Sequence, residues 1–248
     1  MTGSLDGKTA IVTGAASGFG AGIARAFAVE GARVMVADLN GTGAAEIARD
    51  VGGEAVTVDV ASGESVADMA EAARALFGTP DILVNNAGVT HIPAPLDEVS
   101  EADFDRVLAV NAKSVYLTAR SFVPGMKSRG SGAILNIAST AGVSPRPNLN
   151  WYNASKGWMI TATRTMAVEL APFGIRVNAL NPVAGETPLL KSFMGEDTPE
   201  RRAQFLATIP LGRFSTPEDI AAASVFLCSD AASMITGVAM EVDGGRCI

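Results

Sequence analysis

The chain has 248 residues, with 19 Lys and Arg against 26 Asp and Glu, which gives a formal net charge of −7. Hydrophobic residues make up 48% and charged residues 18% of the sequence, so a disordered chain is excluded and one sizeable core is expected. The acidic balance and the lack of a basic run argue against nucleic acid and against an anionic membrane surface as partners.

Short apolar runs alternate with helical patterns along the chain. Strands are predicted at residues 9–12, 33–37, 55–58, 82–84, 133–137, 175–180 and 238–242, and helices at 18–30, 42–51, 64–77, 101–127, 152–171 and 217–228. This alternation is typical of βαβ units around a parallel sheet and indicates a single α/β domain over residues 1–248. The segment 187–212 interrupts the pattern with a polar cluster. We predict that it forms a lid near the carboxyl ends of the strands.

A glycine-rich turn joins the first predicted strand to the first predicted helix. Gly14, Gly18 and Gly20 stand in the run Thr-Gly-Ala-Ala-Ser-Gly-Phe-Gly. Glycines allow the backbone to approach a pyrophosphate closely, and a helix N-terminus offers free N–H groups and a positive dipole end. A glycine-rich turn in this position predicts a dinucleotide site.

Asp38 ends the second predicted strand, 18 residues after Gly20. A carboxylate in this place would accept hydrogen bonds from the hydroxyls of an adenosine ribose and would repel a 2′-phosphate. Asp38 therefore favours NAD over NADP as the cofactor.

Four further residues are candidates for the chemistry of the site. Tyr152 and Lys156 stand four residues apart at the start of a predicted helix and so share one face. A neighbouring ammonium favours the phenolate, which makes the tyrosine hydroxyl a usable acid or base. Ser139 closes the strand before that helix, where its hydroxyl can bond a substrate oxygen. Asn111 lies in the predicted helix 101–127 among apolar neighbours, so a buried role is expected.

These motifs together resemble the short-chain dehydrogenase/reductase family in its short, single-domain form, over essentially the whole chain. The resemblance rests on the order and spacing of the glycine-rich turn, Asn86-Ala87-Gly88, Asn111, Ser139 and the Tyr152/Lys156 pair. It implies a three-layer Rossmann-type α/β fold, doubly wound, with seven parallel strands in the order 3-2-1-4-5-6-7. It also implies an NAD(H)-dependent oxidoreductase that moves hydride between the nicotinamide and a secondary alcohol or ketone.

The resemblance assigns a role to each of four candidate catalytic residues. Tyr152 would be the general acid and base, and Ser139 would orient and polarise the substrate oxygen. Lys156 would hold the nicotinamide ribose and lower the pKa of Tyr152. Asn111 would anchor a water in a proton relay through Lys156.

The resemblance also implies a set of residues around the cofactor. Asp59 and Val60 would flank the adenine, Thr187 would contact the nicotinamide carboxamide, and Phe19 would contribute its backbone N–H. The full predicted set is Gly14, Ser17, Gly18, Phe19, Gly20, Asp38, Asp59, Val60, Asn86, Ala87, Gly88, Tyr152, Lys156, Pro182 and Thr187.

Candidate substrate contacts come from the loops near these motifs. The residues we select are Ser139, His91, Asn148, Trp151 and Glu186. The polar members would suit a small alcohol, polyol or sugar. Arg146 would suit a carboxylate, although solvent exposure is the commoner state of a loop arginine.

Two other functions stay open at this point. One is reduction of a 3-oxoacyl thioester carried by acyl carrier protein or coenzyme A. Asp38 opposes the NADPH that such enzymes commonly prefer, and Lys127, Arg129 and Arg146 make only a thin basic patch for an acidic carrier. The other is a non-catalytic NAD-binding regulator, which the complete set of candidate catalytic residues disfavours.

Location, metal content and assembly follow from smaller signals. The first residues show no signal-peptide pattern, and Cys228 and Cys247 do not make a disulfide framework, so a cytoplasmic protein is expected. With one histidine in the chain, we expect no metal site. The family resemblance implies a homotetramer, with the face of Met159, Thr163 and Met166 and the tail 244–248 as interface elements.

Overall fold

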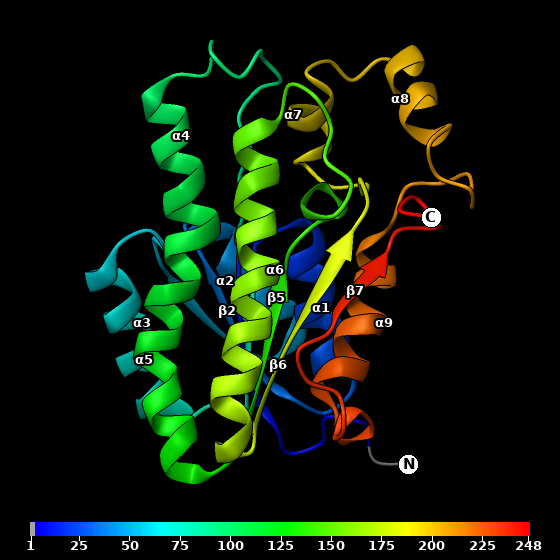
Figure 1. The fold of residues 1–248 in the computed structure, drawn as a ribbon. Coiled ribbons are helices and arrows are strands. Elements are labelled where there is room, and N and C mark those ends of the chain that lie inside the picture. The colour runs from blue at the N-terminus through cyan, green and yellow to red at the C-terminus, as the bar shows by residue number, and fades with distance from the viewer. Residues whose placement is uncertain (1–2) are drawn as a thin grey trace.

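The computed structural model describes residues 3–248 and contains a seven-stranded, fully parallel sheet (Figure 1). The strands lie in the order β3-β2-β1-β4-β5-β6-β7, which confirms the predicted topology. Their bounds are β1 Thr9–Thr13, β2 Arg33–Asp38, β3 Glu54–Thr57, β4 Ile82–Asn85, β5 Gly132–Ile137, β6 Ile175–Pro182 and β7 Ala239–Val242. The order reverses between β1 and β4, and ligands of open α/β sheets bind beside such a reversal.

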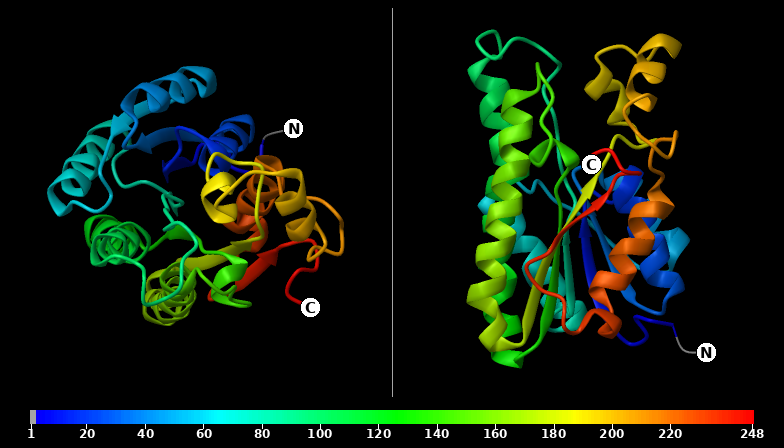
Figure 2. Two further views of the ribbon diagram at one scale, coloured as in Figure 1. Left: turned by 90° about the horizontal axis from the view of Figure 1, so that it is seen from above. Right: turned by 45° about the vertical axis from the view of Figure 1, so that its right-hand side comes forward.

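Helices cover both faces of the sheet (Figures 1 and 2). One layer consists of α1 Gly18–Val29, α2 Gly41–Val51 and α9 Pro217–Cys228. The other consists of α3 Gly63–Phe77, α4 Glu101–Leu108, α5 Ser114–Arg129 and α6 Asn150–Leu170. The short helices α7 Leu190–Met194 and α8 Pro199–Leu206 stand beyond the carboxyl ends of the strands, shown in gold in Figure 2. They lie within the segment predicted to be a lid.

The two largest parts of the core lie on opposite faces of the sheet, because the strands are buried on both faces. Ala10 and Val12 of β1 pack with the layer that contains α1 and α9, whereas Ile11 packs toward α3, α5 and α6. All three residues are fully buried. Apolar burial on this scale contributes about 25 cal/mol for each Å² removed from water. Continuous apolar runs such as β1 are the pattern of a strand covered on both sides.

The predicted helix 101–127 is interrupted at its middle. It divides into α4, a π-helical turn at Ala109–Lys113 and α5. The turn contains Asn111, whose side chain bonds both main-chain groups of Val89 in the neighbouring loop. Single π-helical turns inside α-helices commonly mark functional positions. Side-chain periodicity does not reveal such a turn, because the apolar face continues across it.

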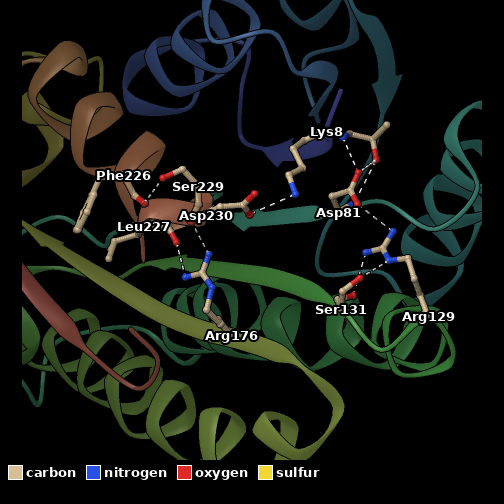
Figure 3. Close-up of polar contacts among 10 residues, drawn as sticks. Lys8, Asp81, Arg129, Ser131, Arg176, Phe226, Leu227, Ser229 and Asp230 are labelled. Carbon is tan, nitrogen blue, oxygen red and sulfur yellow. Dashed lines mark hydrogen bonds and ion pairs between the residues drawn. The ribbon is translucent and has the colours of Figure 1, made fainter. Parts of the chain in front are cut away.

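The amino ends of the strands are held by two arginines (Figure 3). Arg129 bonds the main-chain oxygens of Thr79, Pro80 and Ser131 and forms an ion pair with Asp81. Arg176 of β6 donates to the main-chain oxygens of Leu227, Ser229 and Ile235. These carbonyls lie at and beyond the C-terminus of α9, where helical carbonyls lack intrahelical partners. Arg176 thus ties α9 to the sheet at the end of the molecule away from the glycine-rich turn.

Replacing Arg176 by Met should lower the free energy of unfolding by about 2 kcal/mol, because partly buried carbonyls lose their donors. We expect no change in ligand binding at the cavity described below, since the contact lies at the opposite end of the strands. Urea unfolding of the variant beside wild type measures the effect. Arg49→Met, at an exposed arginine of α2, is the matched control. Equal stability of the Arg176 variant and wild type would contradict the prediction.

Candidate active site

The glycine-rich turn between β1 and α1 has no room for a side chain at Gly14 or Gly20. Gly14 and Gly18 have φ angles of 64° and 55°, in the left-handed region that favours glycine. A Cβ atom on Gly14 would stand 2.7 Å from Ala87 Cα, and one on Gly20 would meet the Gly14 carbonyl oxygen at 2.3 Å. The turn is thus packed tightly against the loop after β4 and leaves the N-terminus of α1 open. This is a cradle that suits a pyrophosphate.

A cavity of about 460 Å³ runs along the carboxyl ends of the strands. This volume is within the usual range for small-molecule sites. Fourteen of the fifteen predicted cofactor residues line this cavity. They are Gly14, Ser17, Gly18, Phe19, Asp38, Asp59, Val60, Asn86, Ala87, Gly88, Tyr152, Lys156, Pro182 and Thr187. Gly20 is behind the turn and acts through packing. The residues at this edge therefore fit a dinucleotide.

The Asp38 carboxylate connects the glycine-rich turn to the end of β2. Its two oxygens accept hydrogen bonds from the backbone N–H groups of Ala16 and Asn40, both at 2.9 Å. Each carboxylate oxygen can accept more than one bond, so capacity for a ribose hydroxyl is retained. At the end of β3, Asp59 accepts from the N–H of Ala61 and lines the same part of the cavity.

Asn86 fastens the loop after β4 to the glycine-rich turn. Its side-chain amide donates to the carbonyl oxygens of Thr13 and Gly14, at 2.9 and 3.0 Å. The Thr13 hydroxyl in turn accepts from the N–H groups of Asn86 and Ala87. Asn86 therefore positions the turn, a role beyond that of lining the cofactor cleft.

Ser139, Tyr152 and Lys156 converge at the wall of the cavity formed by β5 and α6. Burial raises the pKa of Tyr152 to about 12, and a side-chain hydrogen bond with Ser139 opposes this shift. Burial lowers the pKa of Lys156 to about 8. Its ammonium group donates to the Ile137 carbonyl oxygen at 2.8 Å and lies 5.9 Å from the Tyr152 ring centre.

The direction of the tyrosine shift differs from the lowering expected from Lys156. The Tyr152 side chain is only 4% exposed, so loss of solvation of the phenolate outweighs the influence of a cation several ångströms away. The sequence places the two groups on one helix face but does not reveal how deeply both are buried. The neutral phenol is therefore the favoured form of Tyr152 at neutral pH.

The Asn111 side chain is fully buried and joins three elements. Its Oδ1 accepts from Val89 N–H at 2.9 Å, and its Nδ2 donates to the Val89 carbonyl and to Ser155 Oγ. A Cβ atom on Gly88 would approach both Asn111 Oδ1 and Lys156 Nζ, at 3.5 and 3.4 Å. The expected buried role of Asn111 is confirmed, and Gly88 keeps the space between the amide and the ammonium free of a side chain.

Beneath the site lies a chain of hydrogen-bonded, buried polar side chains that was not predicted from the sequence. The Thr118 hydroxyl donates to Asn85, Asn85 donates to Asn136, and Asn136 donates to Thr163, at 2.8, 2.8 and 2.9 Å. The four groups satisfy one another inside the core and link β4 and β5 to α5 and α6. The sequence does contain a signal for this chain. Asn85 and Asn136 stand in two otherwise apolar strands, where a buried side-chain amide needs hydrogen-bond partners.

Four predicted substrate residues do not reach the cavity. His91 is buried at 2% exposure, and its Nδ1 lies 2.9 Å from the Ile92 carbonyl oxygen. Asn148 is exposed and has a φ angle of 64°, so it shapes a turn. The Trp151 ring packs edge-on against Phe104, away from the cavity.

Glu186 is the fourth of these residues. It is exposed and forms an ion pair with Arg202 of α8 at 2.9 Å, which ties the strand end to the lid. Of the predicted substrate contacts, Ser139 alone lines the cavity. The other four were selected from nearness in sequence, which does not indicate where a loop side chain points.

Other residues form the substrate side of the cavity instead. Arg146, expected in solvent, lines it together with Leu149, Asn153, Phe193 and Phe205. The Phe193 ring of α7 meets the Tyr152 ring edge-on at 4.9 Å between centres. Leu149, Asn153 and Phe205 were not identified from the sequence. Leu149 stands three residues before Tyr152. Because residues three apart share a helix face, this spacing could have predicted that Leu149 lies beside Tyr152 at the cavity.

Within residues 3–248, no three His, Cys, Asp or Glu side chains gather closely enough to hold a metal ion. Over the same range, every helix is either too short or too polar to span a bilayer.

A doubly wound sheet with a glycine cradle, and a serine beside a buried tyrosine and a buried lysine, define a nucleotide-binding α/β oxidoreductase. A family model described as enoyl-(acyl carrier protein) reductase matches residues 14–246. The 4-formylbenzenesulfonate dehydrogenase of Comamonas testosteroni is 49% identical over 98% of this chain and 99% of its own. The D-threitol dehydrogenase of Mycolicibacterium smegmatis is 43% identical over 98% of this chain and 94% of its own.

A solved structure agrees with these sequence relatives. The 3-ketoacyl-(acyl-carrier-protein) reductase from Brucella melitensis, in complex with NADH, has a TM-score of 0.94 and 49% identity, and the match covers 98% of this chain and all of that one. The chain belongs to the short-chain dehydrogenase/reductase family. It is an oxidoreductase that acts on CH–OH groups, as predicted from the motifs.

Proposed function

We propose that this enzyme transfers hydride between NAD(H) and a secondary alcohol or ketone, with Tyr152 as the general acid and base. The observation that carries the proposal is that Ser139, Tyr152 and Lys156 meet at the cavity wall, with the Lys156 ammonium 5.9 Å from the centre of the Tyr152 ring. When bound, the nicotinamide supplies the hydride acceptor or donor, and the protein supplies orientation and proton transfer.

The proton follows the hydroxyl group of the substrate. In oxidation, Tyr152 takes the hydroxyl proton as the hydride leaves the same carbon, and in reduction it returns a proton to the ketone oxygen. Ser139 holds the substrate oxygen during either step. Burial keeps Tyr152 protonated at neutral pH, which suits donation to a ketone, and the Lys156 ammonium favours the phenolate needed for oxidation.

The proton then needs a path to solvent. Lys156 and Asn111 flank the open position at Gly88. Asn111 Oδ1 uses one lone pair for Val89 N–H and has a second available for a water. We therefore assign Asn111 to the relay and Lys156 to both the relay and the nicotinamide ribose.

We propose NAD as the preferred cofactor on account of Asp38, and the test is its replacement by Ala. The ratio of kcat/KM with NAD to that with NADP should fall by about 100-fold, because the variant loses ribose hydrogen bonds and a charge that repels the 2′-phosphate. NADH and NADPH formation from one alcohol gives both values. Asp50→Ala on α2, which removes the same charge, is the control. An unchanged ratio in the Asp38 variant would refute the assignment.

Substrate class is tested by the rate of NADH formation across secondary alcohols, polyols, sugars and 3-hydroxyacyl thioesters. Strong turnover of one small hydroxylated compound, lost in Tyr152→Phe, is the expected result. The D-threitol dehydrogenase among the relatives supports a polyol or other small alcohol.

Reduction of a 3-oxoacyl thioester is the second candidate, supported by the similarity to the ketoacyl reductase from Brucella melitensis. Its acidic carrier would need basic residues beside the cleft. Arg146 lines the cavity, but Lys127 and Arg129 lie in the last turn of α5, at the amino ends of the strands. A thioester preference in the panel would establish this candidate over the first.

We also propose a single domain over residues 1–248, with a lid at 187–212 and a cytoplasmic homotetramer as the working form. The ion pairs of Arg202 with Glu186 and Asp197 support an ordered lid. Met159 and Thr163, expected at the interface, are buried in the chain's own core instead. Exposed Trp158 and Val168 of α6 are the apolar residues that support association through that helix.

A further inference from the structure

Arg146 places a cation in the substrate part of the cavity, between β5 and α6. Its guanidinium carbon lies 4.0 Å from the centre of the Phe205 ring. One nitrogen donates to Thr208 Oγ1 at 3.2 Å, and Asn153 Nδ2 holds the main chain of Arg146 at 2.7 Å. The side chain is thus positioned from α6 and from the end of the lid, and four of its five N–H donors have no bond within residues 3–248.

The charge of Arg146 has no counterion within residues 3–248. Seven ion pairs occur there, and Arg146 takes part in none of them. Burial, and with it the positive charge of Arg246, lowers the pKa of Arg146 to about 10. A partly buried cation beside a like charge is costly, unless an anion binds there.

The charged residues that line the cavity are divided between its two ends. Asp38 and Asp59 follow β2 and β3 on one side of the sheet, and Arg146 follows β5 on the other. Lys156 is already bonded to Ile137 O. An anionic group would therefore avoid the acidic end and settle at Arg146, where Leu149, Phe193 and Phe205 offer apolar and aromatic walls.

We propose that the substrate carries, besides the reacting hydroxyl or carbonyl, an oxyanion group such as a carboxylate or sulfonate that binds Arg146, and an apolar or aromatic body that packs against Phe193 and Phe205. This inference rests on the proposed function, whose reaction it leaves unchanged. A guanidinium offers two parallel N–H groups to such an anion, a geometry that a lysine lacks.

Three secondary alcohols of one shape test the inference, namely 4-(1-hydroxyethyl)benzoate, its sulfonate analogue and its neutral carboxamide. With NAD, kcat/KM of wild type should be about 100-fold higher for the anions than for the carboxamide. Arg146→Met keeps an unbranched side chain over Phe205. In this variant the ratio of kcat/KM for the anions to that for the carboxamide should fall to less than about 3, mainly because KM for the anions rises. Arg146→Lys should retain a part of it. Arg201→Met, at an exposed arginine of α8, should retain all of it.

Equal rates of wild type on the anions and the carboxamide, or an undiminished preference in Arg146→Met, would overturn the inference while the proposed function stands. Calorimetric binding of benzoate and benzenesulfonate, with and without NADH, separates the two proposals. Wild type that binds these anions, with binding lost in Arg146→Met, supports the inference. If that same wild-type enzyme oxidises no alcohol, the proposed function alone is refuted. Absence of both binding and turnover would refute both.

Discussion

Replacing Tyr152 by Phe should lower kcat for alcohol oxidation by about 10³-fold, while the affinity for NADH changes by less than about threefold. The phenolate of Tyr152 is the proposed proton acceptor in oxidation, and this side chain lies at the cavity wall with Ser139 and beside the Lys156 ammonium. The ring itself is retained in the variant, so its edge-on contact with Phe193 and the packing of α6 should persist. Steady-state rates and NADH fluorescence titration measure the two effects.

The chain offers a closely matched control for this experiment. Tyr116 is the other tyrosine, is 53% exposed on α5 and accepts a hydrogen bond from Arg120. Tyr116→Phe removes the same oxygen atom far from the cavity and should leave kcat unchanged. A Tyr152→Phe enzyme that turned over at nearly the wild-type rate would show that another group transfers the proton.

Replacing Lys156 by Met should lower kcat/KM by about 100-fold, because both the relay and the positive charge near Tyr152 are lost. The same change should affect stability with a characteristic dependence on pH. Burial holds the pKa of Lys156 at about 8, against 10.5 for the free side chain. Between these values the unfolded chain binds more protons than the folded one, so the free energy of unfolding of wild type rises with pH.

The variant lacks this titration. Unfolding free energies of wild type minus those of Lys156→Met should therefore increase by about 3 kcal/mol from pH 8 to pH 10.5, which is the pKa difference converted at 1.36 kcal/mol for each unit. Denaturant unfolding at several pH values measures the difference. Lys127→Met, at an exposed lysine over the Phe173 ring, should show no such trend. A flat difference for Lys156→Met would show that this ammonium is solvated in the folded protein.

Much of the fold and the cofactor half of the site could be predicted from the chain itself. Apolar runs such as residues 9–12, ended by glycines, dictate buried strands and tight turns through local sterics and burial. Asp38 and Asn86 lie at or directly after strand ends, and parallel strands deliver their carboxyl ends to one edge of the sheet. Main-chain geometry therefore settles where these groups lie, with little contribution from distant contacts.

The substrate half depended on tertiary packing. His91, Asn148, Trp151 and Glu186 are polar or aromatic residues near the motifs, but their loops turn them into the core, toward solvent or onto the lid. Residues of α7 and α8 take their place at the cavity. A local sequence pattern does not predict which side chains of an irregular loop contact a helix about 50 residues further along the chain.

The amino-acid sequence by itself determined the strands of a parallel sheet, the nucleotide cradle and the chemistry of Ser139, Tyr152 and Lys156, because strand periodicity, glycine positions and helical spacing are short-range properties. The order of the strands followed from the family resemblance of these motifs. The tertiary structure alone decided the environment of those groups. It buried Tyr152 enough to raise its pKa, formed the π-helical turn at Asn111, and left Arg146 in the cavity without a carboxylate. Solvation and charge balance depend on all neighbours in space, and these neighbours come from remote parts of the chain.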